Sequence, residues 1–279
     1  MSGSALALFV LMVAVGLAGC ASNHSLPSAT HSSTTSVPTP GVQPVSVMGP
    51  VLGPSFELSD CRNRGGSFSV PRSNLDGILP EGFEAVASTD PTAPPDSVVV
   101  YAIAVSCAAF RVNGTEGKAV ELAYAEVAVT PSTKESVPGI TDCTMPLFFV
   151  ATDEALGAAL HAHGLGLAGT GTLGTTAIET SPGARTDSYT LGDGSLQFIF
   201  GETTPDTLGV TGGDFMLYGV QGGHVVSRLQ GTSEGGTAHY ASAMVQSTGV
   251  PGLTGFRDAA LGFGASGFSL HFRPLAPAP

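Results

Sequence analysis

The clearest hydrophobic pattern in the chain runs from Lys118 to Pro131, where apolar residues fill both sets of alternate positions. Side chains alternate between the two faces of a strand, so Leu122, Tyr124 and Glu126 share one face. The opposite face is also mostly apolar, which predicts a strand that is covered on both sides of a sheet. Glu126 is then a carboxylate among apolar neighbours, where its charge costs free energy unless a partner or water compensates.

Short apolar runs before and after this strand predict a mainly β domain. The predicted strands are residues 67–70, 83–87, 98–104, 146–151, 172–180, 187–191, 195–201, 215–220, 224–231, 237–246 and 268–272. The Asn113-Gly114 pair predicts a hairpin turn between residues 110 and 118. Gly-rich turns separate many of the later strands, and this arrangement is typical of a barrel or a sandwich.

Two segments have the spacing of short helices. One is predicted at residues 71–79, between two strands. A longer helix is predicted at residues 154–163, with Thr152 or Asp153 as its N-cap and Gly164 at its end. The pattern therefore predicts an α+β protein in which β-strands dominate.

The composition indicates a folded, acidic protein. Charged residues make up 11% of the 279 residues, 38 residues are glycine, and the formal net charge is −12. Lys118 and Lys134 are the two lysines, and the arginines are scattered along the chain. Because nucleic-acid affinity rests on clustered Lys and Arg, nucleic acid is excluded as a partner.

The N-terminus predicts export and lipidation. Residues 5–19 form an uninterrupted run of apolar and small residues, shorter than the roughly 20 residues of a membrane-spanning helix and suited to a signal peptide. Its end, Leu-Ala-Gly-Cys at Leu17 to Cys20, resembles a prokaryotic lipobox, which implies that Cys20 becomes the lipid-modified first residue of a membrane-anchored, extracytoplasmic envelope protein. No Lys or Arg precedes the run, unlike the usual signal peptide. A fortuitous apolar terminus is the alternative.

The rest of the chain divides by composition. Residues 21–54 are rich in Ser, Thr and Pro, have almost no charge, and predict a flexible tether between the membrane and the folded part. Residues 55–273 are expected to form a single β-barrel domain. Residues 274–279 predict a frayed tail.

The remaining cysteines allow one disulfide. Besides Cys20, the chain has Cys61, Cys107 and Cys143, an odd number, so one thiol stays unbridged. In an oxidising exterior, Cys61 bonds to either Cys107 or Cys143, and the sequence leaves this choice open. Neither the cysteine spacing nor nearby histidines suit a metal site, so no metal and no cofactor are expected.

Several short motifs resemble one known family. A Leu-Pro-Glu-Gly-Phe element at residues 79–83 is followed by Tyr124-Ala125-Glu126 on the long strand, and the longer helix then leads into further strands. This order is similar to that of the acetoacetate decarboxylase-like family, and the resemblance covers residues 61–174. It implies a closed, cone-like antiparallel β-barrel with a largely apolar central pocket, into which Glu126 faces.

The resemblance fails at the family's catalytic lysine. In the family's decarboxylases, a lysine in a Gly-x-Pro-Lys-type segment after the helix forms a Schiff base with a keto acid. The corresponding residues 164–169 here read Gly-Leu-Gly-Leu-Ala-Gly and contain no lysine. Lys118 lies beside the predicted turn and Lys134 in a polar loop, so neither is placed to replace it. Schiff-base decarboxylation is therefore not expected.

Histidines on the longer helix do not form a metal site. His161 and His163 are two residues apart, which places their rings about 200° apart around a helix. The pattern predicts a surface His161 and a partly packed His163 near the helix C-terminus.

Glu126 has two interpretations. It pairs with an arginine such as Arg62, Arg64 or Arg111 as part of the structure, or it contributes with Tyr124 to a ligand pocket. The first functional hypothesis is a non-catalytic barrel that binds a small apolar or carboxylate ligand. The second is a lysine-independent enzyme that uses Glu126 as an acid or base, and the third is a structural or adhesion lipoprotein without a pocket.

Overall fold

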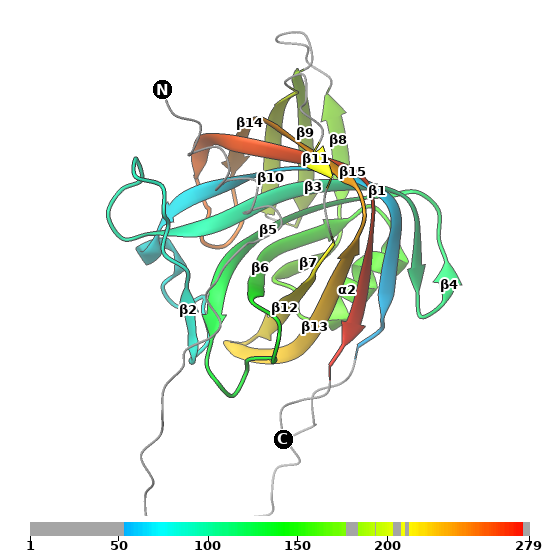
Figure 1. The fold of residues 1–279 in the computed structure, drawn as a ribbon, viewed down its shortest axis with the longest axis horizontal. Helices are drawn as coiled ribbons and strands as arrows, with labels where there is room; N and C mark the ends of the chain where they lie inside the picture. Colours follow the sequence, from blue (N-terminus) through cyan, green and yellow to red (C-terminus); the bar gives the residue numbers. More distant parts are fainter. Residues whose placement is uncertain (1–52, 177–183, 193, 203–207, 210–211, 276–279) are drawn as a thin grey trace, which may run out of the picture.

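The computed structural model describes residues 53–176, 184–192, 194–202, 208–209 and 212–275. In these ranges the chain is a 15-stranded sheet with a single α-helix and one 3₁₀ turn (Figure 1). The prediction of a mainly β fold with a short helix is therefore confirmed. The signal peptide with Cys20, and the tether up to residue 52, lie outside the described residues.

The elements follow one another without long connections in most of the chain. They are β1 Phe56–Pro71, η1 Arg72–Leu75, β2 Phe83–Ala85, β3 Ser97–Val112, β4 Thr115–Glu116, β5 Val120–Pro131, β6 Asp142–Ala151, α2 Glu154–Ala162, β7 Leu167–Thr170, β8 Thr172–Thr176, β9 Ala184–Leu191, β10 Gly194–Glu202, β11 Leu208–Gly209, β12 Asp214–Gln221, β13 His224–Glu234, β14 Thr237–Ser247 and β15 Arg257–Pro274. Among them, α2 is not long and apolar enough to cross a membrane.

Strand pairing forms a circuit. The order β1-β3-β5-β6-β12-β13-β15 is continuous, and β15 also pairs with β1. All of these pairs are antiparallel except β6 with β12, which run parallel. The purely antiparallel arrangement expected from the sequence is thus wrong for the pair of β6 and β12. The chain between these two strands includes α2 and several strands, and it returns to the end of the sheet where β6 began, so that β12 runs parallel to β6.

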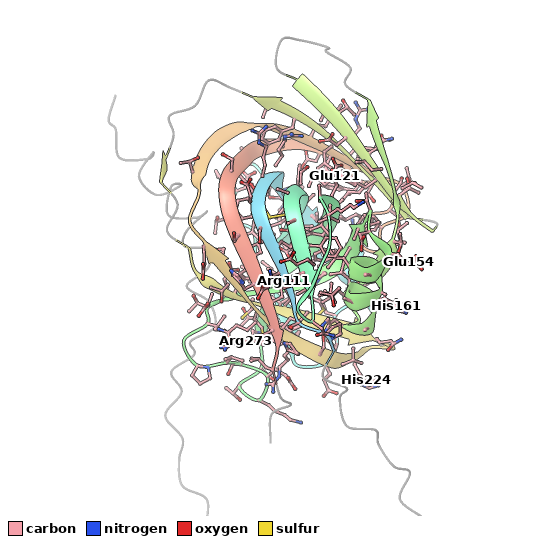
Figure 2. The ribbon with its side chains drawn as sticks, turned by 90° about the vertical axis from the view of Figure 1, so that its right-hand side faces the viewer. Arg111, Glu121, Glu154, His161, His224 and Arg273 are labelled. Carbon is pink, nitrogen blue, oxygen red and sulfur yellow. A yellow bond between two sulfur atoms is a disulfide. The ribbon has the colours of Figure 1, made fainter. Side chains whose placement is uncertain are left out.

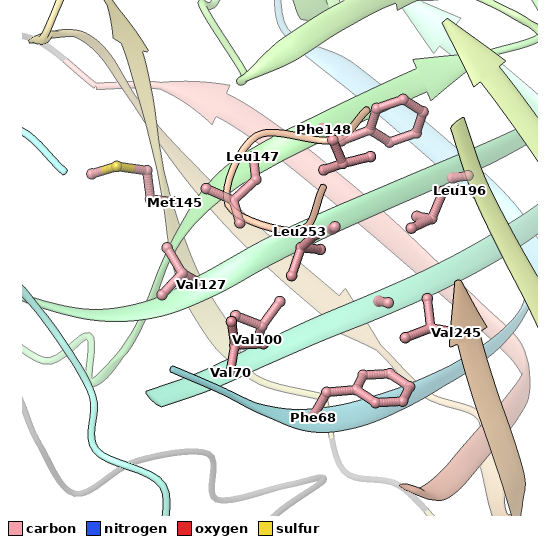
Figure 3. Packing of buried hydrophobic residues seen from close by; sticks show 14 of the residues in the cluster. Phe68, Val70, Val100, Val127, Met145, Leu147, Phe148, Leu196, Val245 and Leu253 are labelled. Carbon is pink, nitrogen blue, oxygen red and sulfur yellow. The ribbon is translucent and has the colours of Figure 1, made fainter. Parts of the chain in front are cut away.

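One face of β1, β3, β5 and β6 is covered by a second layer. Strands β14, β10, β9 and β8 continue the sheet beyond β15. Phe68 and Phe148 from the first layer belong to the same buried cluster as Leu196 and Val245 from the second (Figure 3). This packing covers the face of β5 that carries Ala123, Ala125, Val127 and Val129.

The other face of the circuit has its own buried cluster, called here the interior cluster. Every strand of the circuit contributes to it, as does α2. Its members include Leu58, Ile103, Leu122, Phe149, Leu156, Leu160, Leu217, Leu229 and Phe272. A cluster to which all paired strands contribute lies on the side of the sheet that they enclose. The central strand is therefore covered on both faces, as its hydrophobic pattern predicts.

Local sequence signals explain the helix and the hairpin. Asp153 caps α2, since its Oδ1 accepts hydrogen bonds from the backbone N–H of Ala155 at 2.9 Å and of Leu156 at 3.1 Å. Asn113 and Gly114 have φ of 48° and 80°, as the predicted tight hairpin turn requires.

The predicted helix at residues 71–79 is wrong in its length. The structure has a single 3₁₀ turn, Arg72–Leu75, and the next residue is already extended. Gly77 has φ of 75°, a conformation that a right-handed helix cannot contain. The glycine therefore ends the helical turn early.

The cysteines near the start of the domain form the disulfide. Cys61 on β1 lies directly opposite Cys107 on β3, and the structure joins them. Of the two pairings that the sequence leaves open, this is the first. Cys143 remains a buried thiol on the opposite face of the sheet.

Both ends of the described domain are attached to the sheet or the helix. His163 is fully buried, and its Nε2 donates a hydrogen bond to the carbonyl of Pro54 at 2.6 Å. The expectation of a partly packed His163 is therefore wrong, because the segment before β1 covers the end of α2. His161 is exposed, as predicted (Figure 2). At the other end, the N–H of Leu275 donates to the carbonyl of Arg228 at 2.8 Å.

Candidate functional site

Three neighbouring strands bring polar side chains together on the interior side of the circuit. Tyr101 of β3 lies directly opposite Glu126 of β5, and Tyr124 lies two residues before Glu126. Asp142 and Thr144 come from β6, also two residues apart. Because alternate residues of a strand share a face, each pair points to the same side. These five residues are called here the interior acidic site.

A β-bulge in β6 brings Thr144 to Glu126. The register slips between Ala125 and Glu126, where β6 contributes one more residue than β5 next to Pro146. Proline has no backbone N–H to donate, so a strand that is paired on both sides can contain a proline at a bulge. The hydroxyl of Thr144 consequently donates to Oε2 of Glu126 at 2.9 Å.

Burial dominates the ionisation of Glu126. Its side chain retains 8% exposure and lies among apolar residues. Burial raises its pKa from 4.5 to about 8, against the lowering effect of the Thr144 hydrogen bond and with a further rise from the charge of Asp142. At neutral pH Glu126 is therefore mainly a protonated carboxylic acid, and it can donate a hydrogen bond.

Asp142 differs from Glu126 in its access to solvent. It is partly exposed, and it lies opposite Phe215 in the parallel pair of β6 with β12. Burial raises its pKa from 3.8 to about 6, so it is mainly ionised at neutral pH. The site thus combines one protonated and one ionised carboxyl group. In many active sites, the protonated group of such a pair serves as the acid and the ionised group as the base.

The two tyrosines supply further proton donors. Burial, and after it the charges of Asp142 and Glu126, raise the pKa of the Tyr101 and Tyr124 hydroxyls, so both stay neutral. Neither hydroxyl has a hydrogen-bond partner in the described part of the chain. The ring of Tyr124 stacks on Phe149 with centroids 4.8 Å apart. Both tyrosines are partly exposed.

The predicted pairing of Glu126 with an arginine is wrong in this structure. Arg64 points to the opposite face of β1, where it contacts Asp187 at 2.8 Å. Arg111 lies near the hairpin turn and pairs with exposed carboxylates of β1 and β4. Arg62 is exposed. The partner of Glu126 is a hydroxyl group, which cannot offset its charge as a guanidinium would.

No lysine lies in the site. Lys118 and Lys134 are both exposed. In the segment after α2, Leu165 is fully buried in the interior cluster. Gly166 has φ of 60°, and a Cβ there would overlap the carbonyl of Pro146, so this position cannot take a side chain without a backbone shift.

The sequence pattern indicates Glu126 and Tyr124 as site residues, but it does not indicate the other three members. Tyr101 lies inside an apolar run that indicates only a buried strand. Asp142 and Thr144 lie in a segment whose polar composition predicts a loop, although β6 begins at Asp142. A strand-period reading that started at residue 142 would have found both. In the described ranges, no group of three or more His, Cys, Asp and Glu residues could hold a metal ion.

Comparison with known proteins gives the fold. Neither a protein-family model nor a curated protein matches the sequence. Acetoacetate decarboxylase from Legionella pneumophila is 11% identical, with a TM-score of 0.52, covering 90% of this chain and 98% of that one. An acetoacetate decarboxylase-like enzyme from Sphingomonas wittichii RW1 is 11% identical, with a TM-score of 0.49 and coverage of 85% and 97%.

A third structure is the enduracididine biosynthesis enzyme MppR, complexed with the condensation product of pyruvate and imidazole 4-carboxaldehyde. It is 10% identical, with a TM-score of 0.48 and coverage of 91% and 100%. At these identities the similarity concerns the fold. The family resemblance predicted from the sequence is confirmed at that level: the chain has an acetoacetate decarboxylase-like fold.

Proposed function

We propose that the chain is a membrane-anchored extracytoplasmic lipoprotein whose acetoacetate decarboxylase-like domain binds a small, neutral, largely apolar molecule at the interior acidic site. The observation that carries the proposal is the state of Glu126. This side chain is buried, yet only its Oε2 is hydrogen-bonded. Its Oε1 has no hydrogen-bond partner in the described residues and keeps some solvent access, so this oxygen is open to a ligand.

The surroundings favour an apolar ligand with one polar group. Phe149 and Leu217 flank the site on the neighbouring strands and belong to the interior cluster. Protonated Glu126 and the two tyrosine hydroxyls could donate hydrogen bonds to a carbonyl or hydroxyl oxygen. Such a combination of apolar walls and a few convergent polar groups is typical of small-molecule sites.

Electrostatics disfavour the carboxylate ligand that the sequence also allowed. A bound carboxylate would lie beside ionised Asp142, and no arginine or lysine of the described chain faces the site. Like charges at short distance in a poorly solvated site repel strongly. The same lack of a buried amine argues against a Schiff base. Treatment with borohydride and acetoacetate should leave Lys118 and Lys134 without a mass adduct, and an adduct on either would contradict this.

Binding is tested by the molecules that co-purify with the protein. Mass spectrometry of the native chain should find a neutral organic molecule that is lost in Glu126→Leu, which removes the acid but keeps an apolar side chain. Glu121→Gln is the matched control, because Glu121 lies on the opposite face of the same strand. If Glu126→Leu retains the same molecule at the same occupancy, the site is not its binding place.

The lipid anchor is tested separately. The protein extracted from membranes should begin at a blocked, lipid-modified Cys20, and Cys20→Ser should release it into the soluble fraction. An intact Met1 in the mature protein would contradict the anchor without affecting the binding proposal.

The second candidate is a lysine-independent enzyme of the same fold. The specific observation that favours it is the separation of the carboxyl pKa values, about 8 for Glu126 and about 6 for Asp142. This separation gives one acid and one base near neutral pH.

A further inference from the structure

A base and several proton donors face one another across strands β3, β5 and β6. Asp142 is partly exposed, so its carboxylate can reach a bound molecule. Glu126 offers a carboxylic acid, and Tyr101 and Tyr124 offer neutral hydroxyls that donate to no residue of the described chain. Together they provide one acceptor for a proton and three donors for an oxygen atom.

Strand geometry sets the separation of the carboxyl groups. Asp142 and Thr144 are two residues apart on β6, so their backbones are about 7 Å apart on the same face. Thr144 is hydrogen-bonded to Glu126 at 2.9 Å. The carboxyl groups of Asp142 and Glu126 therefore lie on the same face of two paired strands, close enough for the charge of Asp142 to raise the pKa of Glu126.

The donors are held in place before any ligand binds. Thr144 fixes the carboxyl group of Glu126 through Oε2, and Oε1 keeps some solvent access without a hydrogen-bond partner in the described ranges. Phe149 fixes the ring of Tyr124 by stacking. Donors that are ordered before binding stabilise a developing negative charge without the cost of reorganisation.

We propose that the interior acidic site catalyses proton transfer at the carbon next to the carbonyl group of a small neutral ketone. Asp142 is the base, and Glu126 and a tyrosine hydroxyl hold the carbonyl oxygen. This inference rests on the proposed binding function, since the ketone must first enter the site.

The reaction balances without a cofactor or co-reactant. The Asp142 carboxylate takes a proton from the α-carbon, and the C–H electron pair becomes the C=C bond of an enolate. The carbonyl electron pair moves to oxygen, where Glu126 and the tyrosine hydroxyl donate hydrogen bonds to it. While it is on the partly exposed Asp142, the proton exchanges with solvent. Asp142 then gives a solvent-derived proton to the same carbon, which is exchange, or to a conjugated carbon, which is isomerisation.

The ionisation of the two carboxyl groups supports these roles. With a pKa of about 6, Asp142 is a base at neutral pH, and with a pKa of about 8, Glu126 still carries its proton. For Glu126 the charge of Asp142 adds to the effect of burial, whereas burial alone raises the pKa of Asp142. The hydroxyls of Tyr101 and Tyr124 stay neutral in this range. The rate should therefore rise through about pH 6 and fall above about pH 8.

Exchange of α-protons with solvent tests the proposal without knowledge of the natural ligand. The purified full chain is incubated with cyclohexanone in heavy water, and loss of the α-proton signal is followed by NMR. The native chain should exchange these protons faster than buffer alone. Asp142→Asn should lower the protein-catalysed rate by about 100-fold, which is the low end of the usual contribution of a general base. Circular dichroism verifies that each variant is folded.

Glu126→Gln provides a second readout that a structural role would not move. The amide cannot titrate, so the fall in rate above about pH 8 should disappear while the rise near pH 6 remains. Glu121→Gln, on the opposite face of β5, should keep both limbs of the profile. Exchange should also survive pretreatment of the protein with cyclohexanone and borohydride, followed by removal of both reagents, because no imine forms to be reduced.

Each outcome decides. Exchange that depends on Asp142 supports the proposal. Cyclohexanone that binds by saturation-transfer NMR but does not exchange overturns the enolisation while the binding function stands. Cyclohexanone that neither binds nor exchanges overturns the enolisation of a ketone, and the co-purification experiment decides the binding function separately. Exchange that is lost after the borohydride pretreatment, or that Asp142→Asn leaves unchanged in a folded protein, assigns the reaction to another group.

Discussion

Replacing Glu126 by Gln should stabilise the protein at alkaline pH. Gln has nearly the same shape as protonated Glu, and its amide oxygen can still accept the hydrogen bond from Thr144. The difference is that Gln never becomes a buried anion. Most substitutions of a buried residue destabilise a protein, so a gain in the free energy of unfolding would be a distinctive result.

The magnitude follows from the pKa of Glu126. In the folded chain this pKa is about 8, and its ordinary value is 4.5. Between these values the folded state binds more protons than the unfolded state, so stability falls as pH rises, by about 1.4 kcal/mol per pH unit. The stabilising contribution of the protonated group is complete below pH 4.5 and is lost through about pH 8, on the order of 5 kcal/mol in all. Entry of water beside the anion makes this an upper bound.

Urea-induced unfolding at about pH 5 and about pH 8.5 measures this effect. At the lower pH, Glu126→Gln and the native chain should differ by less than about 1 kcal/mol, and at the higher pH the variant should be more stable by about 2–4 kcal/mol. Asp142 titrates in both proteins, so comparing them isolates Glu126. If both lose stability in parallel over this range, or the variant is less stable throughout, Glu126 is not held protonated and the description of the site is wrong.

Three further changes test the frame around the site by the free energy of unfolding. Replacing both Cys61 and Cys107 by Ala should lower it by about 4 kcal/mol, because the bond closes a loop with a sequence separation of 46; a loss below about 1 kcal/mol in urea would contradict this. Arg64→Ala should cost about 3 kcal/mol, since it removes an ion-pair partner of Asp187, whose side chain is 2% exposed. An unchanged midpoint of thermal unfolding would contradict this, because it would mean that water replaces the pair. Asp153→Ala should cost about 1 kcal/mol through loss of the helix cap, whereas Asp153→Asn should cost less in the same assay.

Patterns with a local physical cause were predicted well. The hairpin at Asn113-Gly114, the cap at Asp153 and the doubly covered strand at 120–131 each depend on residues close in sequence. The length of β15 was not predicted, because residues 261–267 are rich in Gly and Ala and have little strand propensity of their own. Pairing with both β14 and β1 holds this segment extended.

The composition of the site was only partly predictable. An unusual carboxylate in an apolar strand identified Glu126, but its partners depend on strand order and on a register slip that no local pattern encodes. The bulge next to Pro146 decides which residues of β6 face Glu126. The arginine pairing failed for the same reason: Arg64 is close in the sheet but lies on the other face of its strand.

The protonation state of Glu126 depends on the positions of the arginine and lysine side chains. If Arg64 faced the interior, its charge would lower the pKa of Glu126 and leave two carboxylates with no proton to donate. The charge of a buried lysine would lower this pKa as well. Because neither Arg64 nor a lysine faces the site, burial determines the pKa of Glu126, which is about 8. Asp142 is less buried, and its pKa is lower, at about 6. Acid–base chemistry without a covalent intermediate is therefore the reactivity that we propose for this site.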